Sequence, residues 1–118
     1  MDGLSHFEKE IRPWGNFERF TLNEQTTVKI ITVEPQQAFS LQTHAHRGEF
    51  WRVLRGSGRI TVADTIYDAK EGDQFFIPQG AKHRAECEVE SLQFLEIAFG
   101  QFDENDITRL EDRYGRAR

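Results

Sequence analysis

Residues 39–62, FSLQTHAHRGEFWRVLRGSGRITV, carry the local pattern that decides the fold. Short runs of aromatic, aliphatic and β-branched residues at 39–43, 49–54 and 59–62 alternate with polar segments that contain Gly. Such runs are typical of β-strands, and Gly accepts the positive φ angles that tight turns require. This stretch therefore predicts three strands joined by turns at 45–48 and 55–58.

The same rhythm continues on both sides, from residue 16 to residue 100. Further strands are predicted at 17–22, 27–33, 65–69, 74–77, 82–87 and 92–99, with turns at 63–64, 71–73 and 78–80. We expect an all-β core at 16–100, an N-terminal arm at 1–15 and a tail at 101–118. Within the tail, residues 104–114 predict a short C-terminal helix with Ile107 and Leu110 on one side.

Length and composition indicate one domain, spanning residues 1–118. A chain of 118 residues, 37% hydrophobic and with ten Phe, can bury one core but not two. Cys87 is the one cysteine, so neither an intrachain disulfide nor a zinc site built on several thiolates is expected. We expect Cys87 to be a small buried residue rather than a reactive thiol.

The net charge and the hydropathy of the chain indicate which partners and which cellular location to expect. A formal net charge of −5 argues against general binding of nucleic acid, whose phosphates would be repelled. The N-terminus is mixed and charged, and nowhere do eighteen apolar residues run together, so we expect neither a signal peptide nor a membrane span. A cytoplasmic location is the default expectation.

Four polar residues near strand ends form a candidate metal site. Gln42 and His44 share a face because side chains at i and i+2 of a strand point the same way. Glu49 opens the next strand, and His83 opens a later one. A lone His-x-His pair is more often an ordinary surface or core pair, but buried polar groups need partners, and one ion would bind all four. Their mixed O/N donors suit one divalent metal ion: Zn²⁺, Mn²⁺, Co²⁺, Ni²⁺ or Fe²⁺.

The spacing of these residues resembles the two cupin motifs. The second motif, G-x5-P-x-G-x2-H-x3-N, is matched by Gly72, Pro78, Gly80 and His83, with Cys87 at the Asn position. The resemblance implies a double-stranded β-helix, a jelly-roll-like barrel.

The first cupin motif, G-x5-H-x-H-x3,4-E-x6-G, is matched from its end backwards. Gly56 and Glu49 fit, His44 takes the second His position, and Gln42 takes the first. Gln36 stands where the motif opens with Gly. Neither Gln36 nor Cys87 is at a position that normally binds the metal, so the resemblance implies metal ligation by Gln42, His44, Glu49 and His83.

Longer stretches are similar to the type II phosphomannose isomerases. They are RPWG at 12–15, SLQTHAHRGEFW at 40–51, IPQGAKHR at 77–84 and RLEDRYGR at 109–116, and the likeness covers about residues 11–116. In that family the cupin is usually the C-terminal domain of a bifunctional mannose-1-phosphate guanylyltransferase/phosphomannose isomerase, although shorter relatives exist. No nucleotidyltransferase domain lies in these 118 residues, so guanylyltransferase activity is not expected.

The likeness implies interconversion of mannose 6-phosphate and fructose 6-phosphate through an enediol. The metal would polarise the sugar oxygens. His46, just outside the ligand register, is our candidate for the proton carrier; Glu49 competes with it if it is not a ligand, and Arg47 is the third catalytic candidate. The substrate phosphate would be held by cations within the family-like stretches: Arg47, Lys82, Arg84, Arg109 and Arg116. Taken singly, an arginine of this set is more often a solvated surface residue, although Arg109 and Arg116 have more support because they belong to the tail motif.

Other readings stay open. Relatives commonly have His after the motif Glu, whereas this chain has Phe50, which in a regular strand points away from Glu49. The main alternative is a non-catalytic, metal-dependent cupin that binds or senses a sugar phosphate or another small anion. An oxygen-using Fe²⁺ cupin would leave the basic residues unexplained, and a structural cupin would not keep the ligands. We also expect a homodimer, because an exposed edge strand favours pairing.

Overall fold

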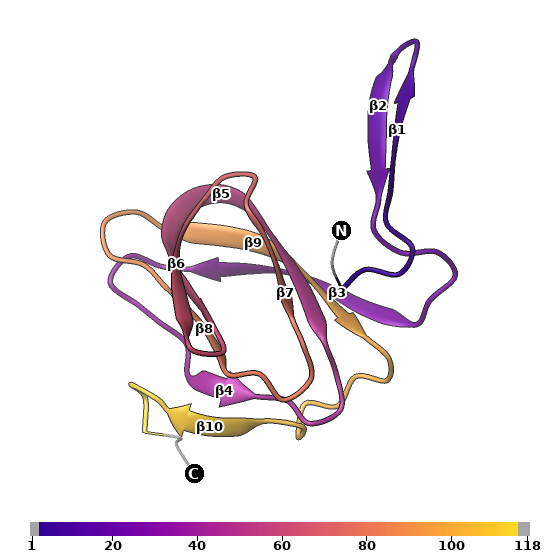
Figure 1. Ribbon diagram of the computed structural model, residues 1–118. Coiled ribbons are helices and arrows are strands. Elements are labelled where there is room, and N and C mark those ends of the chain that lie inside the picture. Colours follow the sequence, from indigo (N-terminus) through magenta and orange to yellow (C-terminus); the bar gives the residue numbers. More distant parts are fainter. Residues whose placement is uncertain (1–2, 116–118) are drawn as a thin grey trace.

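The computed structural model describes residues 3–115, and all regular structure in that range is β-strand (Figure 1). In chain order the strands are β1 Glu8–Arg12, β2 Gly15–Arg19, β3 Thr26–Val33, β4 Leu41–Thr43, β5 Glu49–Val62, β6 Thr65–Lys70, β7 Gln74–Ile77, β8 His83–Glu86, β9 Leu92–Phe99 and β10 Thr108–Glu111. The predicted all-β barrel is therefore confirmed. No helix in this range could cross a membrane.

Two sheets share the long strand β5. Its first half pairs with β7 on one side and β9 on the other, and β3 extends that sheet beyond β9. Its second half lies between β6 and β8, and β4 and β10 continue that second sheet. All these pairs are antiparallel, and Figure 1 shows the two sheets enclosing the barrel interior.

The turn predicted at 55–58 was wrong, because β5 passes through these residues without a break. The register of β5 against β9 shifts between Val53 and Arg55, and Gly56 follows with φ +82°. A bulge with a positive φ bends the strand, so the Gly residues serve to carry β5 from one sheet into the other. A side chain at Gly56 would clash with the backbone oxygen of Ser91.

The apolar core of the barrel fills the space between the two sheets. Trp51, Val53, Ile60, Leu92 and Phe94 are all buried and come from both halves of β5 and from β9. Their positions follow the two-residue alternation of strands, which directs one side chain in two to the interior. The predicted burial of Cys87 is confirmed within the same core.

A backbone constraint explains one departure from the cupin motif. Gln36, at the motif's opening Gly position, has φ +66°, in the left-handed region that Gly enters without cost. Its carbonyl accepts a hydrogen bond from Arg113 Nη1 at 3.0 Å. The motif glycine therefore reflects a turn geometry that this chain adopts with a bulkier residue.

The N-terminal arm contains β1, which forms a hairpin with β2 that extends away from the barrel (Figure 1). At the base of the arm, Leu4, Phe7 and Phe20 pack on the outer face of the first sheet. Near its tip, Ile11 and Trp14 are 85% and 73% exposed. Exposed apolar side chains are common at association surfaces, and the homodimer stays a prediction.

The short helix predicted at 104–114 was wrong. This segment contains β10, which pairs antiparallel with β4 and places Arg109 opposite Gln42. A helix of about three turns is marginal by itself because nucleation is costly, whereas the open edge of β4 offers backbone partners. Tertiary pairing thus overrides a weak local pattern and brings the tail to the mouth of the barrel.

Replacing Gly56 by Ala tests the constraint on β5. The new Cβ clashes with backbone, so we expect unfolding free energy to fall by more than about 3 kcal/mol. Gly72→Ala is the matched control, because Gly72 also has a positive φ, +91°, but has open space around it, and we expect a loss of about 1–2 kcal/mol. Urea unfolding measures both, and equal losses would contradict the clash.

Candidate metal centre

A cavity of about 150 Å³ opens between the two sheets at the polar end of the barrel. It is lined by residues from strands of both sheets and from the segment before β10: Lys29, Ile31, Phe39, Gln42, His44, Arg47, Glu49, Trp51, His83, Glu96, Glu104, Ile107 and Arg109. All four predicted metal ligands and two predicted arginines are among them. The cavity is therefore polar and charged, although it lies within an apolar barrel.

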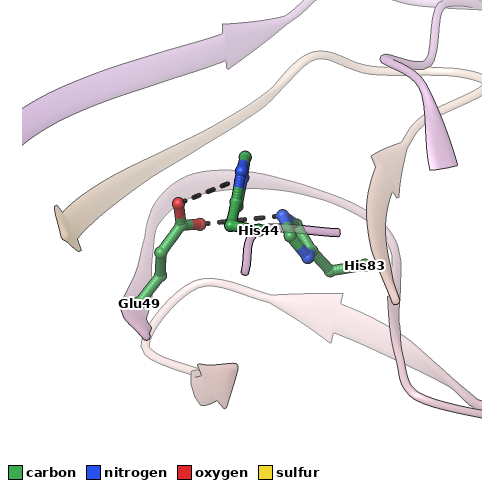
Figure 2. A group of neighbouring side chains, drawn as sticks. All are labelled: His44, Glu49 and His83. Atoms are coloured by element: carbon green, nitrogen blue, oxygen red, sulfur yellow. Dashed lines mark ion pairs between the residues drawn. The ribbon is translucent and has the colours of Figure 1, made fainter. Parts of the chain in front are cut away.

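His44, Glu49 and His83 form the centre of this cavity and are all buried (Figure 2). His44 follows β4, whereas Glu49 and His83 open β5 and β8. Each offers one ligand atom, and these atoms lie within 4.8 Å of one another. Nε2 of His44 is 3.4 Å from Oε2 of Glu49, and Nε2 of His83 is 3.8 Å from Oε1. Two imidazoles and one carboxylate thus converge on one point.

Backbone carbonyls orient both imidazole rings. His44 Nδ1 donates to the carbonyl of Asp106 at 2.6 Å, and His83 Nδ1 donates to that of Ala81 at 3.0 Å. In both rings, protonation at Nδ1 leaves the Nε2 lone pair directed at the centre, as in metal-binding histidines, and the lone pair of His44 accepts a hydrogen bond from Arg47 there. Burial lowers the pKa of both rings below the ordinary value, so both are neutral at pH 7. The donor set fits a divalent ion.

Asp106 holds the loop that carries His44. Its carboxylate accepts hydrogen bonds from the backbone N–H groups of Ala45 at 2.8 Å and His46 at 2.9 Å. Although burial acts in the opposite direction, these two bonds lower the pKa of Asp106. Asp106, just before β10, therefore positions His44 through its backbone carbonyl and the loop after His44 through its carboxylate.

Glu49 is held in its ionised form. Trp51 Nε1 donates to Oε1 at 3.1 Å, and Arg47 Nε donates to Oε2 at 2.9 Å. Burial alone would raise the pKa of Glu49, but the nearby imidazole of His83 and the hydrogen bond from Arg47 outweigh it, so the pKa is lowered. The carboxylate is fixed and available as a ligand.

Arg47 is buried beside the three converging residues. Its Nη2 donates to His44 Nε2 at 3.1 Å, and Nη1 donates to the carbonyl of Asp103 at 3.2 Å. The guanidinium stacks over Phe102 at 4.3 Å from the ring centroid, and the ammonium of Lys29 lies at the same distance from that ring. Two cations therefore border the cavity on the side of the 100–107 segment.

Arg109 borders the cavity from the second sheet. Strand register aligns it with Gln42 on β4 and Gln42 with His83 on β8, so the three side chains form a row facing the same way. Arg109 Nε is buried and has no hydrogen-bond partner among residues 3–115. A buried guanidinium donor without a partner is available to an anion.

Glu96 is a cavity residue that the sequence analysis missed. It lies in the middle of β9, paired in register with Lys29 on one side and Trp51 on the other. Burial and the charge of Glu49 raise the pKa of Glu96 to about 7. A signal was present, because residues 92, 94 and 98 share its face and are all apolar, which leaves one acid on an otherwise apolar face.

The remaining predicted residues lie elsewhere. His46 is exposed on the loop before β5 and does not line the cavity. Lys82 is 3.0 Å from Asp64, and Arg84 bonds to the carbonyl of Phe39 and to Glu111, so both are engaged away from the cavity. Arg116 lies outside the described residues.

Curated relatives share this sequence over most of its length. The chain is 38% identical over 114 residues to mannose-1-phosphate guanylyltransferase ManC of Salmonella typhimurium, covering 94% of this chain and 24% of the relative. It is 38% identical to alginate biosynthesis protein AlgA of Pseudomonas aeruginosa, covering 89% and 22%. The chain thus spans about a quarter of the length of these relatives.

Solved structures share the fold. A cupin 2 conserved barrel protein from Rhodopseudomonas palustris has a TM-score of 0.64 at 26% identity, over 70% of this chain and 57% of its own. A putative sugar phosphate isomerase from Acidithiobacillus ferrooxidans has a TM-score of 0.58 at 25% identity, over 64% and 51%. The model of the family "Mannose-6-phosphate isomerase C-terminal" matches residues 2–112. This chain, a cupin barrel with a buried His/Glu/His centre, therefore belongs to the mannose-6-phosphate isomerase C-terminal family.

Proposed function

We propose that this protein is a metal-dependent sugar-phosphate isomerase that interconverts mannose 6-phosphate and fructose 6-phosphate. One observation carries the proposal. Two buried, neutral imidazoles and an ionised carboxylate converge in the same cavity as two arginines, in a chain of this family. A metal-binding donor set next to cationic side chains, one of which has an unpartnered donor, is what a reaction on a phosphorylated, carbonyl-containing sugar requires.

The ligands of one divalent ion would be His44, Glu49 and His83, with Gln42 as a fourth donor. The Nε2 atoms of both imidazoles and the carboxylate of Glu49 already face one point. Gln42 lies opposite His83 in the strand register, and its amide oxygen is neutral, so it would leave the charge of the site unchanged. When bound, such an ion supplies Lewis-acid polarisation of a substrate oxygen.

The cavity's cations would hold the phosphate. Arg109 has a buried Nε without a partner among the described residues, and Arg47 and Lys29 border the same space. Arg matches phosphate oxygens with paired donors, which fixes the far end of the sugar relative to the metal ligands. Of the five cations predicted from the sequence, Arg47 and Arg109 keep support from their positions.

Phe50 does not occupy the cavity. Its side chain is fully buried on the opposite face of β5, within the cluster that contains Leu4 and Ile97, and its ring lies 5.2 Å from that of Phe20. The residue that replaces the usual His therefore packs under the N-terminal arm. Its identity removes no group from the cavity, which supports an intact catalytic site.

One observation favours the alternative of a non-catalytic sugar-phosphate binder. His46, the proton carrier predicted from the sequence, is exposed outside the cavity. A barrel that binds a metal and an anion without a proton carrier would bind the sugar phosphate and not turn it over. Measuring turnover separates the two functions.

Metal binding tests the assigned ligands. The purified protein is expected to bind one Co²⁺ or Zn²⁺ per chain in titration calorimetry, and His44→Ala is expected to weaken this binding at least ~100-fold, because one of the converging donors is lost. His6→Ala removes an exposed imidazole outside the cavity and serves as the matched control. Equal affinities for the two variants would contradict the assigned site.

Turnover tests the proposed reaction. Protein stripped of metal and reloaded in turn with Zn²⁺, Mn²⁺, Co²⁺, Ni²⁺ or Fe²⁺ is expected to convert mannose 6-phosphate in a coupled assay with at least one ion. His44→Ala is expected to lose this activity. Stoichiometric metal binding without turnover by any ion would refute the isomerase and leave the binder as the function.

Arg109→Ala tests the anion site. Loss of a charged hydrogen-bond donor is expected to raise KM for mannose 6-phosphate by about 10–100-fold. Arg59→Ala is the control, because Arg59 pairs with Glu86 and Glu88 on the surface and does not line the cavity. An unchanged KM in Arg109→Ala would exclude this residue from phosphate binding.

A further inference from the structure

Glu96 is a carboxyl group buried among apolar side chains, a costly position that calls for an explanation. It is 5% exposed in the middle of β9, and Leu92 and Phe94 on the same face are fully buried. It lines the cavity from the first sheet, whereas His83 lines it from the second. Trp51 lies between them: it pairs in register with Glu96, and its ring is 5.6 Å from that of His83.

No ion pair accounts for this burial. Within residues 3–115, no Lys, Arg or His nitrogen lies within ion-pair distance of the Glu96 carboxylate. Lys29, its neighbour in register, is instead 3.8 Å from Glu104. A buried carboxyl without a charged partner costs free energy that an apolar residue at this position would not cost. Stability therefore does not explain the residue.

Metal ligation does not account for it either. The converging group of ligand atoms consists of His44, Glu49 and His83, and Glu96 is outside it. A carboxyl that faces a reaction cavity, close to the metal ligands but not among them, is suitably placed to act on a substrate carbon. His46 lacks this placement because it is exposed outside the cavity.

We infer that Glu96 is the catalytic residue that carries the proton between C1 and C2 of the sugar phosphate, an inference that rests on the proposed function. The Glu96 carboxylate takes the proton from C2 of open-chain mannose 6-phosphate. The C2–H electron pair forms the C1–C2 double bond, and the C1 carbonyl electrons move to O1, which gives the enediolate with its negative charge on O1.

The second half returns the proton. Glu96 delivers it to C1, the hydroxyl proton of O2 passes to O1, and the C2–O2 bond becomes the ketone of fructose 6-phosphate. Every atom of the substrate is retained, and no oxidant or reductant is needed. One carboxyl on one face of the sugar is sufficient, because C1 and C2 are adjacent.

Glu96→Gln tests this role, since it keeps the shape of the side chain and removes the base. Turnover of mannose 6-phosphate by the metal-loaded variant is expected to fall at least ~100-fold, with metal stoichiometry and melting temperature close to those of the unaltered protein. In D₂O the unaltered protein is expected to place deuterium on carbon in the recovered sugar phosphates, and Glu96→Gln is expected to place none. Glu86→Gln, a surface carboxyl paired with Arg59, is the matched control and is expected to keep both properties.

The outcomes separate this inference from the proposed function. Wild-type turnover that persists in Glu96→Gln overturns the role of Glu96 and leaves the isomerase intact; His46→Gln then identifies whether the exposed imidazole is the carrier. Loss of metal or of folding in Glu96→Gln also overturns it, because the residue would then be structural. A wild-type protein with no turnover and no deuterium exchange overturns the proposed function together with this role.

Discussion

The passage of one strand through two sheets is the constraint on which the rest of the structure depends. β5 pairs with β7 and β9 in its first half and with β6 and β8 in its second, and Gly56 lies at the change of direction. A side chain at Gly56 would meet the backbone before β9, so the bend requires Gly there. Because Glu49 opens β5, the same bend sets the distance between this carboxylate and the His83 ring across the barrel.

Hydrogen bonds hold the side chains of the cavity in place. Backbone carbonyls accept the hydrogen bonds from Nδ1 of His44 and of His83, so no charged side chain is needed to orient the rings. Glu49 is ionised with help from Arg47 and Trp51. Burial and the charge of Glu49 raise the pKa of Glu96, which lies on β9.

The C-terminal segment completes the site. Asp106 orients His44 through its carbonyl and restrains the following loop through its carboxylate, Phe102 supports the guanidinium of Arg47, and β10 places Arg109 beside Gln42. None of these contacts is local in the chain; the His44–Asp106 bond joins residues 62 positions apart. A truncated barrel without this segment would keep the ligands but lose the groups that orient them.

Local residue type was sufficient to predict most strands. Runs of aromatic, aliphatic and β-branched residues predicted β3, β4, β6 to β9 and, as two separate strands, both halves of β5. The spacing that resembles the cupin motifs identified the candidate ligands Gln42, His44, Glu49 and His83. The i, i+3 pattern of residues 104–114 predicted a helix. This pattern is weak, and pairing with the edge of β4 makes part of the segment a strand instead. Glu96 was passed over because its significance depends on which face of β9 is interior.

By itself, then, the sequence determined the fold class and the family, because both follow from residue types at short spacings along the chain. Only the tertiary structure decided which charged groups face the cavity. It placed Arg47, Arg109 and Glu96 inside, and it left His46, Lys82 and Arg84 outside. The physical reason is that the facing of a side chain across a barrel depends on strand register and on bends such as that at Gly56, which join residues far apart in sequence and have no local signature.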